Sequence, residues 1–272
     1  SKSKGLADCA ALVATVTDVT LGPDSTVDDI DGGCRVTNLS YGVSSYMSYS
    51  VDEVTLRSPD LLATFPTGEI FEAAELEIKG LRIRPVTHSP LQDYIIGLTT
   101  IGMDLRLAYT TDPDALTSQA EFAFSAEKLG HFALTAALSD FDNTDVDIDD
   151  IADFTGRLNR LDLTLEDRGL FVAIFAPAVL NMLFPPDEDP SGAIMLMQET
   201  AVATLAQLPE GTLTPGSLVS LGTLIRALPN PQGDWHVGFA SESGISLDDL
   251  NTGDPAAMLA DATITATGEP AL

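Results

Sequence analysis

The feature that most constrains the fold is a series of three stretches in which apolar and polar residues alternate. They occupy residues 103–109, 121–125 and 132–138, and short polar turns at 112–114 and 127–130 separate them. Alternation with period two is typical of strands that bury one face, and short turns join antiparallel neighbours. We therefore predict an antiparallel meander in the middle of the chain.

Two further patterns extend this sheet. The alternating segment 161–165 is followed by Gly169 and then by Leu170, Val172 and Ile174, which predicts another hairpin with the glycine in its turn. The apolar parity also changes at Lys79-Gly80, and again across residues 51–54. Because a bulge produces such a change of phase, these positions predict a curved and strongly twisted sheet.

Helical spacing is confined to fewer segments. Residues 192–208 are apolar nearly all round, so we expect that helix to be buried or to cover a sheet. A second helix is predicted over 215–228, shorter ones over 90–99, 146–158, 177–183 and 254–260, and late strands over 235–239 and 262–267. The predicted fold class is α+β, a long twisted mostly antiparallel sheet packed on one or two apolar helices. We predict a single elongated domain, 1–272, with a subdivision conceivable near 185–190.

The charge of the chain limits its partners. There are 41 acidic and 13 basic side chains, a formal net charge of −28, while 44% of the residues are hydrophobic. That apolar fraction argues against disorder, and the charge argues against nucleic acid and anionic lipid as partners. Aspartate is spread along the whole chain and only four lysines occur, which favours adaptation to salt over cation binding by clustered carboxylates.

The two cysteines bear on the cellular compartment. Cys9 and Cys34 fit one disulfide in an oxidising compartment, and two buried free thiols are the alternative. We expect an exported protein, periplasmic or extracellular, whose signal peptide has been removed. Residues 1–4 fit either a mature end or an expression remnant, and no run of about 18 apolar residues predicts a transmembrane segment.

The densest acidic stretch, residues 140–150, is a candidate calcium site. Short Asp-rich loops supply the oxygen ligands that calcium prefers, and the candidate ligands are Asp140, Asp142, Asp145 and Asp147. The stretch does not match the EF-hand spacing, and a solvated loop or a helix start is the reading that we favour. A second acidic cluster, residues 24–31, allows the same two readings. We predict no cofactor, with calcium as the one candidate.

Catalytic patterns are weak. The chain has no G-x-S-x-G and no phosphate-binding glycine loop, and its histidines, His88, His131 and His236, occupy turn or outward strand positions. The cysteines and dispersed histidines do not form a zinc pattern. We therefore predict no catalytic residues and no enzyme, and a hydrolase that uses two carboxylates remains a third hypothesis.

Apolar side chains on the predicted sheet and helices offer a different kind of site. Methionines adapt to irregular contents, and a gap between a curved sheet and a helix can accept an apolar molecule. An ordinary filled core is the alternative. The candidate ligand-binding residues are Phe122, Phe124, Phe132, Met182, Phe184, Met195 and Met197.

Three stretches resemble exported bacterial β-rich proteins of the AsmA-like and TULIP-like lipid-transfer type. They are residues 50–85, 161–174 (LDLTLEDRGLFVAI) and 235–250 (WHVGFASESGISLDDL). The resemblance lies in the style of strand and turn, and it implies a long twisted sheet around a helix and the binding or transport of lipids. It assigns no functional residues.

These observations predict an exported protein that binds an apolar small molecule or lipid in a groove between sheet and helix. The alternative is a structural or interaction protein of the cell envelope, with an envelope protein as partner and calcium as an optional stabiliser.

Overall fold

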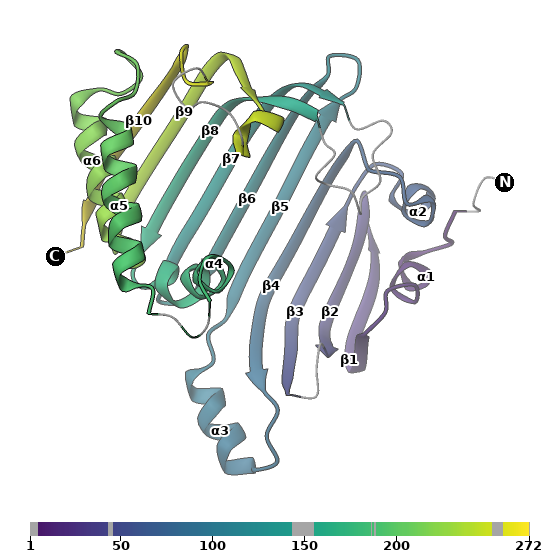
Figure 1. Cartoon of the computed structure of the whole chain (residues 1–272). Coiled ribbons are helices and arrows are strands. Elements are labelled where there is room, and N and C mark those ends of the chain that lie inside the picture. Colours follow the sequence, from purple (N-terminus) through teal and green to yellow (C-terminus); the bar gives the residue numbers. More distant parts are fainter. Residues whose placement is uncertain are drawn as a thin grey trace. The chain divides into compact units, whose positions relative to one another are not determined.

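A computed structural model of the chain describes residues 5–42, 46–142, 155–185, 187, 189–251 and 258–271. The ten strands follow one another in sequence order, from β1 to β10, as an antiparallel meander (Figure 1). The contacts within the chain divide it into two compact units. Unit 1 comprises Ser1–Glu127 and Asp142–Phe154, and unit 2 comprises Lys128–Phe141 and Thr155–Leu272. The predicted α+β class, a long mostly antiparallel sheet with a few helices, is confirmed.

Unit 1 contains six strands with short helices at their ends. The strands are β1 (Val19–Ile30), β2 (Gly33–Gly42), β3 (Met47–Arg57), β4 (Ala73–Pro85), β5 (Met103–Asp112) and β6 (Thr117–Ala126). The helices are α1 (Cys9–Val13), α2 (Leu61–Thr64), the 3-10 turn Phe65–Thr67, and α3 (Pro90–Thr99) between β4 and β5. Strands β5 and β6 are the first two runs of the predicted meander, and β7 (Gly130–Asp142) in unit 2 is the third.

The change of phase predicted at Lys79-Gly80 lies where β4 leaves the regular extended conformation. The one predicted across residues 51–54 lies on β3, opposite Asn38 of β2. Asn38 has φ 53° and Gly80 has φ 64°, and the register between β4 and β5 shifts between Ile78 and Leu81. The bulge predicted at Lys79-Gly80 is therefore confirmed. Glycine suits position 80 for two reasons: its φ is positive, and an added Cβ would clash with the Asp52 side chain. The backbone N–H of Gly80 donates to Asp104 Oδ1 at 2.8 Å and holds the bulge to β5.

A disulfide stabilises one end of unit 1. Cys9 at the start of α1 is bonded to Cys34 on β2, with Cα atoms 5.5 Å apart, which confirms the predicted pairing. Both cysteines are buried in a small core with Leu12 and Leu61. The carboxylate of Asp29 on β1 accepts the backbone N–H of Cys9 at 2.9 Å, so this acid of the 24–31 cluster fixes α1 to the sheet.

Unit 2 contains the remaining strands and the longer helices. They are β7, the strand β8 (Thr155–Asp167), a π-helical turn Phe171–Phe175, α4 (Ala176–Leu183), α5 (Ser191–Leu205), α6 (Pro215–Ala227), β9 (Gly233–Ser246), the 3-10 turn Asp248–Asn251 and β10 (Ala262–Pro270). Strand β9 pairs with β8 on one side and β10 on the other. Helix α6 packs on β10, and α5 packs beside α6 (Figure 1).

The hairpin predicted around Gly169 is wrong. Residues 171–175 form a helical turn that continues into α4, and β8 pairs with β9 in place of a strand at 170–174. The buried carboxylate of Asp167 explains the change of direction, because its Oδ1 accepts the N–H groups of Gly169 at 2.7 Å and Phe171 at 3.3 Å. A side chain that caps the first free N–H groups favours a helix start over a strand return.

The helix at 192–208, which we expect to be buried or to cover a sheet, forms as α5 and packs beside α6, but it is not buried. Helix α5 contains no buried residue, and Met195 and Leu196 are 63% and 70% exposed. The other predicted helices divide into three groups. Those at 90–99, 177–183 and 215–228 are confirmed as α3, α4 and α6. The segment 146–158 lies outside the described residues up to 154 and continues as strand β8, and most of 254–260 lies outside them as well.

Two domain-level observations remain. The prediction of one elongated domain stays a prediction, and residues 185–190 belong to unit 2. Among the helices that the structure describes, none combines the length and the apolar character needed to cross a bilayer.

Candidate functional site

The sheet of unit 1 has one apolar and one charged face. Apolar and polar residues alternate along its strands, and the register aligns residues of the same kind on neighbouring strands. Across β3, β4, β5 and β6, apolar residues pair with apolar ones: Val54 with Ile78, Leu76 with Leu107, and Leu107 with Phe122. The side chains of these residues, with those of Leu56 and Leu105, form what we call the apolar face. Charged residues occupy the intervening positions and define the charged face. The faces lie on opposite sides since successive side chains in a strand point to opposite sides of the sheet.

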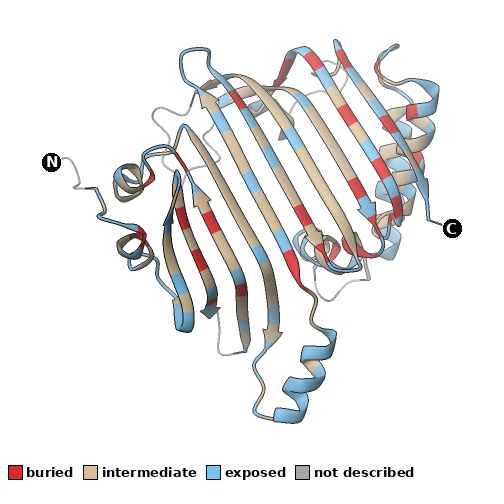
Figure 2. Cartoon of the chain, turned by 180° about the vertical axis from the view of Figure 1, so that it is seen from behind, coloured by how far each residue is buried: buried red, intermediate tan, exposed pale blue. Residues whose placement is uncertain are grey.

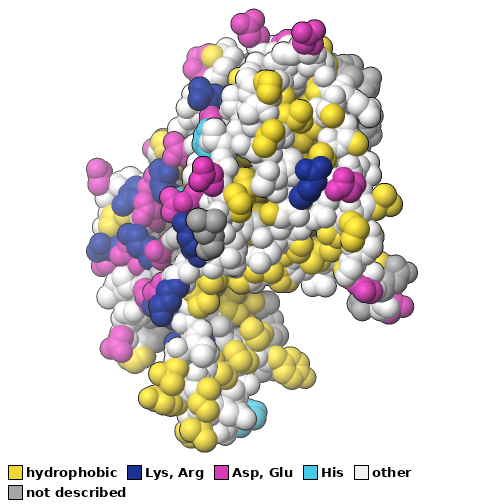
Figure 3. Space-filling model, turned by 90° about the vertical axis from the view of Figure 1, so that its left-hand side faces the viewer, with side chains coloured by type: hydrophobic (Ala, Val, Ile, Leu, Met, Phe, Trp, Pro, Cys, Tyr) yellow, Lys and Arg dark blue, Asp and Glu magenta, His cyan; other side chains and the backbone are white. Residues whose placement is uncertain are grey.

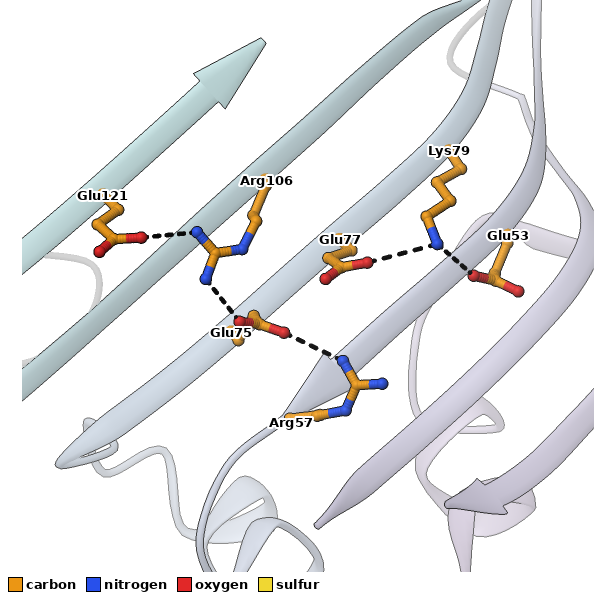
Figure 4. Close-up of polar contacts among 7 residues, drawn as sticks. All are labelled: Glu53, Arg57, Glu75, Glu77, Lys79, Arg106 and Glu121. Atoms are coloured by element: carbon orange, nitrogen blue, oxygen red, sulfur yellow. Dashed lines mark hydrogen bonds and ion pairs between the residues drawn. The ribbon is translucent and has the colours of Figure 1, made fainter. Parts of the chain in front are cut away.

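The charged face contains a ladder of ion pairs that spans four strands (Figure 4). Arg106 on β5 donates from Nη1 to Glu121 Oε2 at 2.7 Å and from Nη2 to Glu75 Oε2 at 2.8 Å. The second carboxylate oxygen of Glu75 accepts from Arg57 Nη1 at 3.0 Å. The charged ladder is completed by Lys79, Glu53 and Glu77, with Lys79 Nζ 3.1 Å from Glu53 Oε1 and 3.5 Å from Glu77 Oε2.

The ladder shifts the pKa values of its members in the direction that keeps them charged. Hydrogen bonding from Arg106, together with Arg57, lowers the pKa of the Glu75 carboxyl below its usual value. Hydrogen bonding to Glu53 raises the pKa of the Lys79 ammonium. Figure 3 shows basic and acidic side chains interleaved in a band on one side of that view.

A shallow hollow of about 540 Å³ adjoins the ladder in unit 1. Arg57, Glu75, Arg106 and Glu121 line it, together with small residues such as Ala73 and Ala108. Both guanidinium groups in the hollow already bind carboxylates, and those carboxylates already accept from guanidinium groups. The charged face therefore offers a weak site for an added anion or cation, and its arrangement is that of a structure-stabilising network.

The apolar face is incompletely covered. None of the 13 residues of β4 is buried, although β3 and β5 flank this strand on both sides (Figure 2). A buried core of Val36, Leu39 and Val51 on β2 and β3 covers one side of it, and Val54, Ile78 and Leu81 pack against that core. Beyond that core, Leu107 on β5 remains 41% exposed and Ile83 at the end of β4 remains 38% exposed. The middle of unit 1 thus presents apolar side chains to solvent in a pattern that a covered sheet would not show.

The structure places the predicted ligand-binding residues in several locations. Phe122 and Phe124 lie on β6, on the apolar face, with Phe124 only 7% exposed. Phe132 on β7 packs against Phe175, with ring centroids 5.5 Å apart. Phe184 is half-buried directly after α4, whereas Met182 on α4 and Met195 and Met197 on α5 are exposed. Within unit 1, therefore, the structure brings together Phe122 and Phe124 with the apolar residues of β3, β4 and β5.

The predicted metal ligands are only partly described. Asp140 and Asp142 are exposed residues of β7, and Asp145 and Asp147 lie outside the described residues. The described part of the chain contains one group with metal-ligand spacing, Cys9, Asp29 and Cys34. Its two sulfurs are bonded to each other and the Asp29 carboxylate accepts from the Cys9 N–H, so this group has a structural explanation.

Comparisons with known proteins provide no assignment: no family model matches the chain, and no curated protein matches it either. The resemblance to AsmA-like and TULIP-like proteins therefore stays a prediction. The site rests on the geometry of the sheet alone.

The sequence interpretation missed the charged ladder. Its signal was present in β4, where Glu75, Glu77 and Lys79 alternate with Leu76 and Ile78. The partners come from strands 18 to 31 residues away, and the pairing could be found only by aligning the charges of one strand with those of its neighbours.

Proposed function

We propose that the protein binds an apolar small molecule or a lipid acyl chain on the apolar face of unit 1, without catalysing a reaction. The observation that carries the proposal is strand β4: it lies inside the sheet, has one apolar side, and contains no buried residue. Leaving large apolar side chains partly exposed costs free energy, about 25 cal/mol for each Å² that a ligand could remove from water. A bound apolar chain recovers part of that free energy.

The two faces support this role together. The ion pairs of the charged ladder join β3, β4, β5 and β6 side by side, and they keep charge away from the opposite face. A surface that binds acyl chains needs this absence of charge, since an unpaired charge buried under a ligand is strongly unfavourable. Export to the periplasm or beyond is part of the proposal, because the Cys9–Cys34 disulfide is typical of oxidising compartments.

The test compares two neutral substitutions on the same strand. Leu107→Gln places an amide on the apolar face, whereas Thr110→Gln changes an exposed residue at a position of the opposite parity. We expect delipidated wild-type protein to bind a fluorescent long-chain fatty acid, Leu107→Gln to bind it roughly tenfold more weakly, and Thr110→Gln to bind it as the wild type does. Absence of saturable binding by the wild type, or equal losses in both variants, would overturn the proposal and leave the envelope interaction protein as the better hypothesis.

A further inference from the structure

Helix α3 forms a tip between β4 and β5 that is exposed to solvent at every residue except the half-buried Ile96. None of its ten residues is buried. Leu91, Tyr94, Ile95 and Leu98 are between 51% and 68% exposed, and their spacing of three, four and seven residues places them in one stripe. Figure 3 shows the corresponding cluster of hydrophobic side chains at the lower end of the molecule, where Figure 1 shows α3.

Local hydrogen bonds hold this helix, in which only Ile96 is half-buried. Ser89 caps its start and accepts the N–H of Gln92 at 3.4 Å, and Thr100 Oγ1 donates to the carbonyl of Ile96 at 2.7 Å. Isolated helices shorter than about 12 residues are marginal in water, and most helices in proteins depend on a buried apolar face. A ten-residue helix with its apolar stripe in water therefore has the features of a helix that packs against an external surface.

The charges of the tip indicate what that surface is. Residues 86–101 contain no lysine or arginine and a single acid, Asp93, in a chain with 41 acids. The Asp93 carboxylate accepts from the Thr87 hydroxyl, and its position is on the helix side opposite the stripe. The tip thus lacks both the cations that attract anionic lipid and the carboxylates that repel an uncharged interface.

The size of the stripe argues against a second copy of this chain. Large apolar side chains offer up to about 200 Å² each, so four of them at this exposure present on the order of 500 Å². A stable protein interface buries about 800 Å² on each partner. Two chains with a formal charge of −28 each would also repel, whereas a zwitterionic bilayer would not repel them.

We propose that α3 docks in the interface of a zwitterionic lipid bilayer, lying in its plane with Leu91, Tyr94, Ile95 and Leu98 toward the acyl chains. Tyrosine suits this position, because its ring is apolar and its hydroxyl reaches water. The helix is about 15 Å long at 1.5 Å per residue, enough to lie in the interface and too short to cross the bilayer. This inference goes beyond the proposed ligand binding, and it stands on different residues.

The experiment is flotation of the full chain with phosphatidylcholine vesicles. Leu91→Gln/Leu98→Gln removes the two ends of the stripe, and the fold should be unaffected since neither residue is buried. Met195→Gln/Leu196→Gln is the matched control, because it changes two equally exposed apolar residues of α5. We expect wild type and the α5 variant to float with the vesicles and the α3 variant to partition at least tenfold less. A Tyr94→Trp variant should show a blue-shifted emission that brominated lipid quenches.

Three results would overturn the proposal. They are absence of flotation by the wild type, equal losses in the α3 and α5 variants, and a change of oligomeric state by the α3 variant in the absence of lipid, which would assign the stripe to self-association. Fatty-acid binding distinguishes this proposal from the ligand site: the α3 variant should keep that binding, and Leu107→Gln should keep its flotation.

Discussion

The disulfide between α1 and β2 allows a quantitative prediction, because it closes one defined loop. Cys9 and Cys34 are separated by 25 residues, and both are buried in the core that joins α1 and α2 to β1 and β2. In the chain-entropy model a cross-link of this span restricts the unfolded chain and stabilises the folded one by about 3.5 kcal/mol. That amount is a large part of the stability of an ordinary domain.

Reduction of the wild type and the double variant Cys9→Ala/Cys34→Ala provide two ways to remove the bond. Reduction removes the cross-link and keeps both sulfur atoms in the core, so it isolates the loop contribution. The variant removes the sulfur packing as well, and we expect it to be less stable than the reduced wild type. Comparing the two separates cross-link from packing.

Hydrogen exchange measured by mass spectrometry is the suitable assay, because it reads the strands separately. A loss of about 3.5 kcal/mol corresponds to a roughly 300-fold faster exchange of the slowest amides. We expect this change in peptides from β1, β2 and β3, and a much smaller one in peptides from β9 and β10. An acceleration below roughly threefold in β2 would refute the reasoning, since each tenfold step corresponds to about 1.4 kcal/mol.

Three other perturbations test the account of unit 1 and of the charge of the chain. Gly80→Ala should destabilise the protein by about 1–2 kcal/mol in urea titration, because the φ of 64° and the nearby Asp52 carboxylate both disfavour a Cβ. Gly97→Ala on α3, where nothing lies near the added atom, should be neutral or stabilising, and equal effects of the two substitutions would contradict the assigned bulge. The pKa of Glu75 is lowered in the folded protein, so its ionised form adds stability above pH 4.5, the ordinary pKa of a glutamate, and this stability is lost as the pH falls through the folded-state pKa. Arg106→Gln should raise the pKa of Glu75 in an NMR titration, whereas Arg160→Gln, whose partner is Asp162, should leave it unchanged. The melting temperature should rise when the NaCl concentration is increased from about 0.1 to about 1 M, because the Debye length falls from about 10 to 3 Å and screens the repulsion among carboxylates. A lower melting temperature at high salt would show that ion pairs outweigh this repulsion.

The strands of this fold were predictable because their signal is local. Alternation at 103–109, 121–125 and 132–138 predicts β5, β6 and β7, and the helix predicted over 90–99 agrees with the observed bounds of α3. The failure at Gly169 arose because Leu170, Val172 and Ile174 give only three alternating positions, too few to distinguish a strand from a helix. The Asp167 side chain favours the helix by accepting the backbone N–H groups of Gly169 and Phe171. These contacts exist only once the backbone is helical, so the alternation pattern does not reveal them.

The candidate site was harder to predict, because it depends on which strands are neighbours and on what covers them. The sequence indicated apolar residues such as Phe122 and Phe124 but not how far they are covered. The exposure of a central strand such as β4 depends on the layers around it. The same alternating sequence would be found in a strand that a helix covers. The expected burial of α5 failed for the same reason, since apolar composition does not determine what packs against a helix.

The central claim, that the apolar face of unit 1 binds an apolar chain, is tested most directly by photolabelling. A fatty acid with a diazirine in its acyl chain is bound to the delipidated protein, irradiated, and mapped by peptide mass spectrometry with unlabelled fatty acid as competitor. The account predicts competable labels on β4 and β5, at Ile83, Leu107 and their apolar neighbours. Labels confined to α5 or to the charged ladder, or labels that the competitor does not reduce, would contradict it.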